Sequence, residues 1–383
     1  MIYRKLGKTG MSASVIGLGT EHLDNKPFEI VDEVIHTAMD QEINIMDLFM
    51  PGAEVRENIG KALDKNRDKF IIQGHFGSVD LNKQYDISRD PIVCQKYFDD
   101  LLLHLNTDYI DIGMLFYIDS EKDFNSVFHT DFVNHVIKMK EQGKVRAIGA
   151  SSHNPIYAKK AVETGILDVL MFSINPAFDM TPPGEDCLGF FLESENGRPA
   201  GAVTNIDPAR MDLYRLCEKN DIAITVMKTL GAGKLISPEH TPFQSPLTVW
   251  QCIHYALTRP AVTSVMLGCK SGHEVLEAIK YLTLSDNERD YSQTVSTFSS
   301  DFRGKCMYCN HCLPCPADID IAAVTKFLDI ALLDKNNIPP SIRQHYQALT
   351  THASDCIACG SCESRCPFSV NIIDNMMLAQ TIF

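Results

Sequence analysis

Short apolar runs alternate with amphipathic stretches along residues 1–290. The apolar runs are rich in Val, Ile and Leu, as in buried parallel strands, and the amphipathic stretches repeat apolar residues at helical spacing. We predict strands at 15–19, 43–48, 70–75, 109–118, 145–151, 169–175, 222–230 and 264–268. We predict helices at 29–41, 54–63, 91–105, 128–142, 155–164, 208–219, 246–257 and 273–281. Eight strand–helix units in this length predict an α/β fold, a (β/α)₈ TIM barrel.

A doubly wound sheet is the alternative fold. It would use fewer strands and would carry a glycine-rich fingerprint after its first strand. Here Gly17 and Gly19 are followed by Thr20 and Glu21, without the third glycine of that fingerprint. The barrel is therefore preferred.

The pattern changes after Ser285, so we predict a second, smaller domain over residues 291–383. Helical periodicity marks 319–333 and 341–351 within it, between two cysteine runs. The runs consist of Cys306, Cys309, Cys312 and Cys315, and of Cys356, Cys359, Cys362 and Cys366, each ending in Cys-Pro. Three thiolates at a spacing of three, then a fourth before proline, is the ligand pattern of a ferredoxin with two [4Fe–4S] clusters.

The fourth ligand of each cluster usually comes from the other run. We therefore pair Cys306, Cys309, Cys312 and Cys366 on one cluster, and Cys356, Cys359, Cys362 and Cys315 on the other. One departure is that two residues, not three, separate Cys312 from Cys315. Zinc sites use two-plus-two spacing, and disulfides need an oxidising compartment, so both alternatives fit less well.

Composition narrows the class of protein further. The net charge of −14 argues against nucleic acid and against an anionic membrane surface as partners. The N-terminus lacks the apolar segment of a signal peptide, and no stretch has the apolar length of a membrane helix, so we expect a cytoplasmic protein. Eight of the 13 cysteines belong to the two runs, and most of the others are expected to be small buried residues.

Catalytic side chains of such barrels lie at the carboxyl ends of the strands. These ends carry His22, Asp47, His75, Ser151 to His153, Asn175 and Lys228. The loops after strands seven and eight usually bind phosphate, and here they contain Gly231, Gly233 and Lys234, then Lys270 and Ser271. Glycines admit backbone N–H groups close to a phosphate, so a dinucleotide site is predicted there. The candidate cofactor-binding residues are Ser151, Ser152, Asn175, Lys228, Gly231, Gly233, Lys234, Lys270 and Ser271.

The chain resembles the aldo/keto reductases, in the branch fused to a C-terminal ferredoxin domain. The resemblance rests on Tyr3-Arg-Lys-Leu-Gly-Lys-Thr-Gly10, Asn44-Ile-Met-Asp47, Asn58-Ile-Gly-Lys-Ala-Leu63, Thr107-Asp-Tyr-Ile-Asp111, Gly143-Lys-Val-Arg-Ala-Ile-Gly149, Val226-Met-Lys-Thr-Leu-Gly-Ala-Gly-Lys-Leu235 and both cysteine runs. It implies a (β/α)₈ barrel that binds extended NAD(P)H, with the diphosphate near strands seven and eight. Lys270 and Ser271 match positions that contact the adenosine 2′-phosphate, which slightly favours NADP(H).

The family reduces carbonyls with a tetrad of Asp, Tyr, Lys and His, and most of this tetrad is replaced. Asp47 matches, but Gly52, His75 and Phe116 occupy the positions expected for the Tyr, Lys and His. Losing one transition-state donor typically costs a factor of about 10²–10³ in rate. Ordinary NADPH-dependent carbonyl reduction is therefore not expected.

Three functions remain open. The first is an oxidoreductase whose barrel binds a small-molecule substrate, and NAD(P)H, while the clusters move single electrons to or from a donor or acceptor protein. The second is a carbonyl reductase in which Asp47 and His75 form a rebuilt acid–base pair. The third is a non-catalytic electron-transfer protein with the barrel as a docking scaffold. The first is preferred because hydride moves two electrons at once and clusters pass one; a flavin could convert between them, although no sequence feature requires one.

Overall fold

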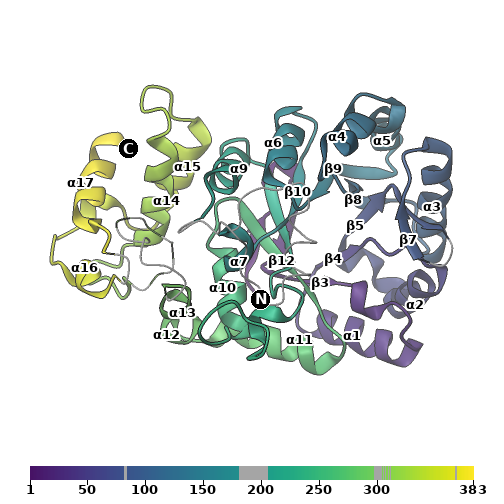
Figure 1. Cartoon of the computed structure of the whole chain (residues 1–383), viewed down its shortest axis with the longest axis horizontal. Helices are drawn as coiled ribbons and strands as arrows, with labels where there is room; N and C mark the ends of the chain where they lie inside the picture. Colours follow the sequence, from purple (N-terminus) through teal and green to yellow (C-terminus); the bar gives the residue numbers. More distant parts are fainter. Residues whose placement is uncertain are drawn as a thin grey trace.

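The computed structural model describes residues 1–81, 84–180, 206–296, 304, 306, 308, 310, 312–366 and 369–383. Parallel strands close into a barrel in the order β10-β11-β12-β3-β4-β5-β8-β9, so neighbours in sequence are neighbours in space (Figure 1). The strands are β3 (Ile16–Gly19), β4 (Ile45–Leu48), β5 (Ile71–Phe76), β8 (Ile110–Leu115), β9 (Val145–Ser152), β10 (Val169–Ser173), β11 (Ala223–Met227) and β12 (Val262–Gly268). The predicted barrel is confirmed.

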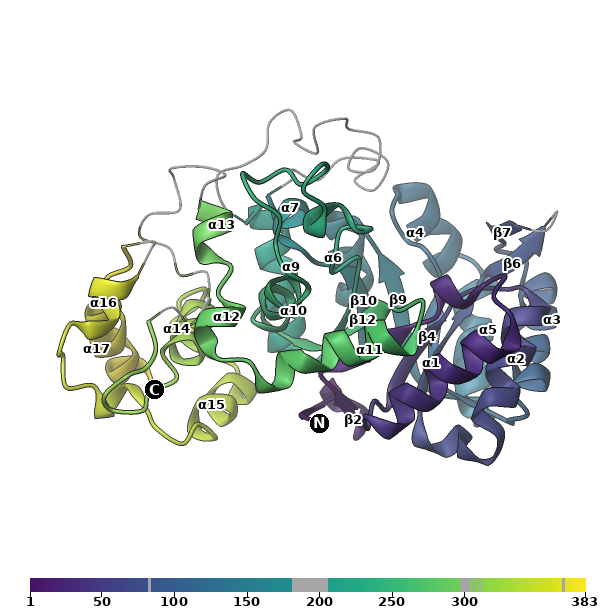
Figure 2. The same ribbon diagram turned by 90° about the horizontal axis from the view of Figure 1, so that it is seen from below.

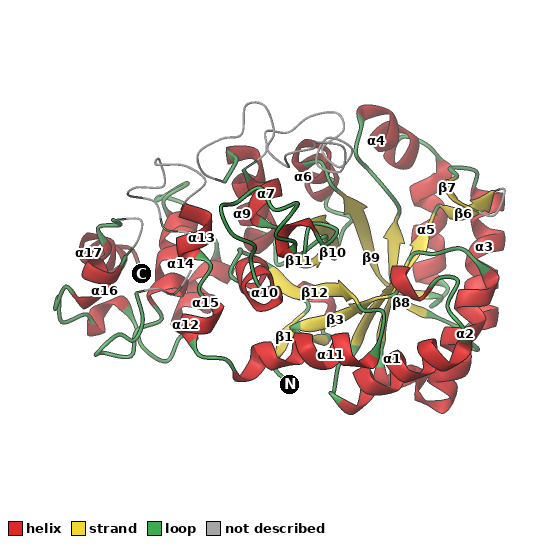
Figure 3. Ribbon diagram, turned by 60° about the horizontal axis from the view of Figure 1, so that its bottom comes forward, coloured by secondary structure: helices red, strands yellow, loops and turns green. Residues whose placement is uncertain are grey.

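Helices surround the barrel on its outer face, as Figure 3 shows. They are α1 (Phe28–Asp40), α2 (Ala53–Leu63), α3 (Pro91–His104), α4 (Glu121–Phe128), α5 (Asp131–Glu141), α6 (Pro155–Glu163), α9 (Pro208–Lys219), α10 (Val249–Leu257) and α11 (Gly272–Ile279). Local signals define their starts: Asp90 accepts from the backbone N–H of Ile92 at 2.8 Å, and Pro91 occupies the first turn of α3.

One predicted helix is wrong in extent. The segment 128–142 is not a single helix, because α4 ends at Phe128 and α5 begins at Asp131. Thr130 is the N-cap of α5 and accepts from the backbone N–H of Phe132 at 3.3 Å. A capping hydroxyl favours a new helix start over a continuing helix.

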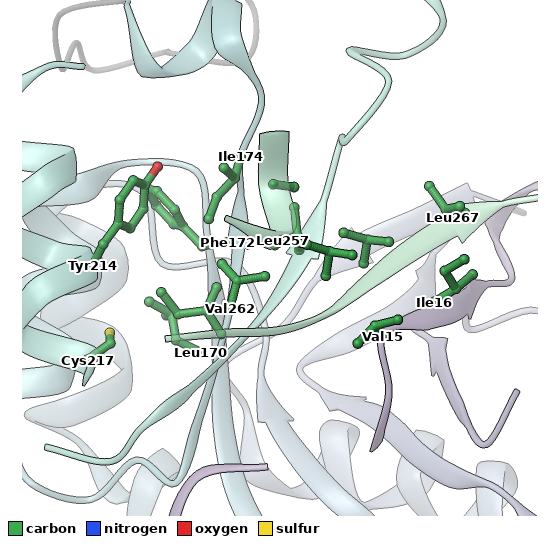
Figure 4. Packing of buried hydrophobic residues seen from close by; sticks show 14 of the residues in the cluster. Val15, Ile16, Leu170, Phe172, Ile174, Tyr214, Cys217, Leu257, Val262 and Leu267 are labelled. Atoms are coloured by element: carbon green, nitrogen blue, oxygen red, sulfur yellow. The ribbon is translucent and has the colours of Figure 1, made fainter. Parts of the chain in front are cut away.

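Two apolar layers build the core. The outer layer packs the strands against the helices, and Figure 4 shows part of it, with Leu170 and Phe172 of β10 near Tyr214 and Cys217 of α9. The inner layer fills the barrel and includes Ile45, Ile112, Met171 and Met266. Leu6 belongs to this inner layer, beside the hairpin of β1 (Tyr3–Lys5) and β2 (Ser12–Ser14), so the hairpin region covers the amino ends of the strands.

A second hairpin, for which no strands were predicted from the sequence, lies at the opposite end of the barrel. It pairs β6 (Ser78–Leu81) with β7 (Gln84–Ile87) directly after β5. The segment between Met180 and Asp207, for which neither a strand nor a helix was predicted, lies largely outside the described residues. Short helices α7 (Pro176–Asp179), α12 (Asp286–Arg289) and α13 (Ser292–Ser296) complete this part of the chain.

The C-terminal region is helical and lies beside α9 and α10 (Figures 1 and 2). It contains α14 (Ile321–Ala331), α15 (Pro340–Gln347), α16 (Ser361–Arg365) and α17 (Ile372–Ile382). The side chain of Glu218 on α9 pairs with Lys326 and His345, each at 3.6 Å, which joins the barrel to α14 and α15. Among the described residues, no helix has the length and apolar character needed to cross a membrane.

Candidate functional site

Asp47 and His75 are in hydrogen-bond contact at the carboxyl end of the barrel. Strands β4 and β5 are paired in register, with Asp47 opposite Gln73. The Nε2 atom of His75 lies 2.7 Å from Oδ1 of Asp47, and Nε2 of Gln73 donates to the same oxygen at 2.9 Å. Both members of the pair are buried. The carboxylate therefore accepts from Nε2–H and fixes the tautomer of the imidazole.

Aromatic rings enclose His75. The ring centroids of Phe116 and Phe49 lie 5.3 and 6.0 Å from that of His75, and the two phenylalanines stack at 5.9 Å. Among the described residues, Nδ1 of His75 is buried without a hydrogen-bond partner. With Nε2–H bound to Asp47, Nδ1 carries the lone pair that can take up a proton. A buried polar atom of this kind is costly unless a ligand uses it.

A second histidine–aspartate pair lies at the ends of β8 and β9, and sequence reasoning missed its acid. Nδ1 of His153 lies 2.8 Å from Oδ2 of Asp119, and the backbone N–H of His153 donates to Oδ1 at 2.6 Å. Burial raises the pKa of Asp119, but the His153 charge and these hydrogen bonds outweigh it, so the pKa lies below its ordinary value. The signal available was the acid four residues after the end of β8, beside the Ser-Ser-His end of β9.

The predicted cofactor residues on β9 and after β10 are engaged within the chain. Oγ of Ser151 accepts from the backbone N–H of Tyr117 at 2.9 Å, and Oγ of Ser152 lies 2.7 Å from the carbonyl of Ile118. The Nδ2 atom of Asn175 donates to the carbonyl of Lys228 at 2.9 Å. These side chains hold the strand-end loops in place.

The loop after β11 makes its own turns. Backbone N–H groups of Gly231, Gly233 and Lys234 all donate to carbonyls within the loop, at 2.8–3.0 Å. Gly233 has a φ of 86°, a left-handed conformation that favours glycine. Nζ of Lys228 lies 3.7 Å from Oε2 of Glu21. In this conformation the loop does not present the backbone donors of a phosphate cradle.

Acidic side chains occupy the loop after β12. The backbone N–H of Lys270 donates to Oε2 of Glu274 at 2.7 Å, and that of Gly272 donates to Oε1 of Glu33 at 3.0 Å. Oγ of Ser271 caps α11 by accepting from the backbone N–H of Glu274 at 3.4 Å. Two carboxylates thus accept the backbone N–H groups of Lys270 and Gly272 in this structure. The preference for NADP(H) stays a prediction.

A buried ionic cluster, which the sequence did not predict, follows β10 in the chain and is centred on Asp179. Asp179 accepts from the hydroxyls of Tyr214 at 2.5 Å and Tyr255 at 2.7 Å, and it lies 3.6 Å from Arg210. Burial raises the pKa of the Asp179 carboxyl, although the charges of Arg210 and Arg259 oppose the rise. Because Asp179 also donates its backbone N–H to Asn175 at 3.0 Å, the cluster supports the strand-end loop from behind.

Cysteines of both runs line one hollow in the C-terminal region. Its lining consists of Cys315, Pro316, Ile319, Ile321, Cys356, Ile357, Ala358, Cys359, Cys362, Ile372, Ile373 and Met376. Apart from the cysteines these side chains are apolar, and Cys359 is exposed whereas Cys362 is buried. The fourth cysteine of the first run thus lies with three of the second run.

The remaining cysteines are described in part. Cys312 is buried, Cys306 and Cys366 are half-buried, and Cys309 lies outside the described residues. The backbone N–H of Tyr308 donates to Sγ of Cys306 at 3.4 Å. The guanidinium of Arg365 donates to the carbonyl of Cys312 at 2.6 Å, which ties the two runs together.

Within the described ranges, no three or more His, Cys, Asp or Glu side chains are close enough to share one metal ion. A single zinc with Zn–S bonds of about 2.3 Å would need thiolates about 4 Å apart. A cubane carries its ligands on separate iron atoms, so those ligands lie farther apart.

One cavity lies away from the barrel mouth. It has a volume of about 360 Å³ and lies between the amino ends of β11 and β12 and the helices α14 and α15. Lys326 and His345 line it and are each ion-paired to Glu218, which also lines it. The cavity lies at the amino ends of the strands, whereas the active sites of such barrels lie at the carboxyl ends.

Comparisons with known proteins agree with this geometry. Residues 15–179 match the model of the aldo/keto reductase family. A putative aldo-keto reductase from Pseudomonas aeruginosa is similar in structure, with a TM-score of 0.56, 17% identity, and coverage of 74% of this chain and 96% of that one. The holo form of aldo-keto reductase AKR11C1 from Bacillus halodurans is also similar, with a TM-score of 0.59 and 17% identity. This match covers 78% of this chain and 97% of that one. No curated protein sequence matches the chain.

Proposed function

We propose that the protein is an iron–sulfur oxidoreductase in which the barrel binds a small-molecule substrate and two [4Fe–4S] clusters carry electrons. The observation that carries the proposal is the hollow lined by Cys315, Cys356, Cys359 and Cys362. Cys315 is about forty residues from the other three in sequence, yet it lines the same space, as a ferredoxin pattern with exchanged fourth ligands requires.

The residues present fit such a group. Four soft thiolates facing a hollow otherwise lined by apolar side chains are a donor set for iron–sulfur clusters. Cys306, Cys312 and Cys366, with Cys309, supply a second set from the same two runs. When bound, the clusters supply one-electron transfer; the chain's part is to hold them and to shield them with Ile and Met side chains.

Asp47 and His75 are proposed to handle the proton of the reaction. Asp47 holds Nε2–H of His75, so Nδ1 accepts or returns a proton on the substrate side. The rings of Phe49 and Phe116 exclude water from the imidazole. Gln73 binds the same carboxylate oxygen and keeps Asp47 in position.

Standard tetrad chemistry does not fit this mouth. Phe116 packs against His75 where the family has its own histidine, and a phenyl ring cannot polarise a carbonyl. A carbonyl reductase with a rebuilt Asp47–His75 acid–base pair is the second candidate, and the direct contact of the two side chains favours it over a non-catalytic scaffold.

A nicotinamide is not assigned a step. The backbone N–H groups of Gly231, Gly233 and Lys234 donate within the loop after β11, and those of Lys270 and Gly272 donate to Glu274 and Glu33. A flavin likewise has no feature in the described residues that requires it.

Anaerobic purification with a cofactor inventory tests the proposal. We expect about eight iron and eight sulfide ions per chain, the content of two cubanes. Aldehydes and ketones with NADPH should give turnover near background. If the protein contains zinc alone, or about two iron ions per chain, the proposal of two [4Fe–4S] clusters is refuted. Rapid reduction of aldehydes would favour the carbonyl reductase with a rebuilt acid–base pair.

A further inference from the structure

The two cysteine runs have different surroundings. In the second run, Cys359 is exposed and the neighbouring Ile357 is 65% exposed, and both line the hollow. Helix α16, which carries Cys362, lies on the side of the C-terminal region away from the barrel in two views (Figures 1 and 2). The second run therefore reaches solvent at Cys359 and Ile357.

The first run faces the barrel. Tyr308 follows Cys306 by two residues and is only 2% exposed. Its hydroxyl donates to Oδ2 of Asp329 at 2.6 Å, and its ring lies 5.4 Å from the guanidinium of Arg259. Arg259 follows α10 of the barrel, so Tyr308 joins the first run to the barrel wall.

Bonded and stacked groups continue from this contact to the mouth. The guanidinium of Arg259 lies 4.4 Å from the ring centroid of Tyr255, whose hydroxyl donates to Asp179 at 2.7 Å. The backbone N–H of Asp179 donates to the carbonyl of Asn175, directly beyond β10. Electron tunnelling is favoured by contiguous packed and hydrogen-bonded groups over gaps, and this series supplies them.

We propose that the two iron–sulfur sites are unequal: the site of Cys315, Cys356, Cys359 and Cys362 receives electrons from donors in solvent, and the first-run site passes them to the barrel through Tyr308 and Arg259. The inference rests on the proposed function. Each step moves one electron: the donor in solvent is oxidised as the outer site is reduced, the outer site then reduces the inner one, and the inner site reduces the small-molecule substrate in the barrel. No covalent bond forms in the transfers between the sites, and the proton of the reduced substrate comes from the Asp47–His75 pair.

A negative charge introduced beside the solvent-facing site tests whether electrons enter there. Ile357→Glu is compared with Ile357→Gln, which has the same shape without the charge. The probes are reduced methyl viologen, a cation, and dithionite, which supplies an anionic radical. A unit charge about 6 Å from the transfer point changes the local concentration of a singly charged donor about two- to threefold at 0.1 M salt. Stopped-flow bleaching should become faster with viologen and slower with dithionite.

Leu333→Glu is the matched control on the same region. Leu333 is 57% exposed and follows α14, whose first residue Ile321 lines the hollow. At 1.5 Å per residue the two positions are about 18 Å apart, beyond the Debye length of about 10 Å at 0.1 M salt. Its reduction rates should equal those of the wild type. The proposal would be overturned if both Ile357 variants were reduced at equal rates. It would also be overturned if Leu333→Glu changed the reduction rates as much as Ile357→Glu does.

Single-site variants give an independent readout. Cys306→Ser should keep the solvent-facing cluster and be reduced as fast as the fast phase of the wild type. Cys359→Ser should keep the inner cluster and be reduced at least tenfold more slowly. The reverse order would overturn the assignment. Iron and sulfide counts on the wild-type protein come first, so absence of clusters refutes the proposed function, whereas clusters with equal rates refute only the inequality.

Discussion

Glu218 joins the barrel to the C-terminal helices, and removing its charge should loosen that junction. Oε1 lies 3.6 Å from both Nζ of Lys326 and Nδ1 of His345, and Oε2 accepts from the backbone N–H of Ala261. Burial raises the pKa of Glu218, but the Lys326 and His345 charges outweigh it and lower the pKa from 4.5 to about 2.

The size of this effect follows from the pKa. One pKa unit corresponds to about 1.36 kcal/mol, so full ionisation of Glu218 contributes about 3 kcal/mol at neutral pH. The exposed fractions of the Lys326 and His345 side chains are 22% and 39%, so solvent screens part of the pairing. We expect Glu218→Gln to lower the free energy of unfolding by about 2–3 kcal/mol at pH 7.

The pH dependence has a defined sign. Because the folded-state pKa lies below the unfolded value, the contribution is complete above about pH 5 and is lost as the pH falls from 4.5 toward 2. The difference between wild type and Glu218→Gln should therefore shrink progressively over that window.

Urea unfolding followed by circular dichroism measures the difference, with fluorescence of Trp250, the single tryptophan, reporting on the barrel. Glu239→Gln is the control, because Glu239 is exposed and loses the same charge. A barrel transition that stays in place while the helical signal unfolds earlier would locate the loss at the junction. If Glu218→Gln unfolds like the control at pH 7, the ionic junction is not stabilising and the reasoning fails.

Three further predictions concern the two sites. Asp47→Asn and His75→Ala should each lower turnover by ~10²-fold once a substrate is found, with iron content unchanged; full activity in both would move proton transfer elsewhere. Calorimetry should show NADPH binding slightly more tightly than NADH, and Glu274→Gln should strengthen NADPH binding about threefold by removing a like charge; equal NADPH binding by the variant and the wild type would contradict this reasoning. Cys315→Ser should lower iron to about four per chain and remove the same paramagnetic signal as Cys356→Ser; loss of different signals would break the exchange of fourth ligands between runs.

The barrel was predictable because its strands are buried on both faces and follow one another around the axis. Apolar runs of β-branched residues and intervening helical periodicity mark each unit without reference to distant contacts. The contact of Asp47 with His75 followed from the same rule, since consecutive strand ends in such a barrel are neighbours. The prediction of one helix over 128–142 failed for a local reason. The apolar periodicity continues through this segment, and only the hydroxyl of Thr130 marks the start of α5.

The sequence does not show which backbone N–H groups of the loops after β11 and β12 already have acceptors in the folded chain. Glycines and lysines after β11 and β12 favour a phosphate site by composition, yet Glu33 on α1 and Glu274 on α11 accept the backbone N–H groups there. Glu33 is far from this loop in sequence, so only the folded chain brings it there. Asp119 is similar, because its role depends on meeting His153 across two strand ends.

The same reasoning explains why the mouth and the cysteine runs belong to one account. A tetrad-type hydride transfer needs neither the clusters nor a buried series of contacts between Tyr308 and Asp179. A single-electron route needs both, together with a proton-handling group at its end, and Asp47 with His75 supplies that group. Under the function proposed above, Asp47 with His75 at the mouth and the two cysteine runs serve one single-electron chemistry.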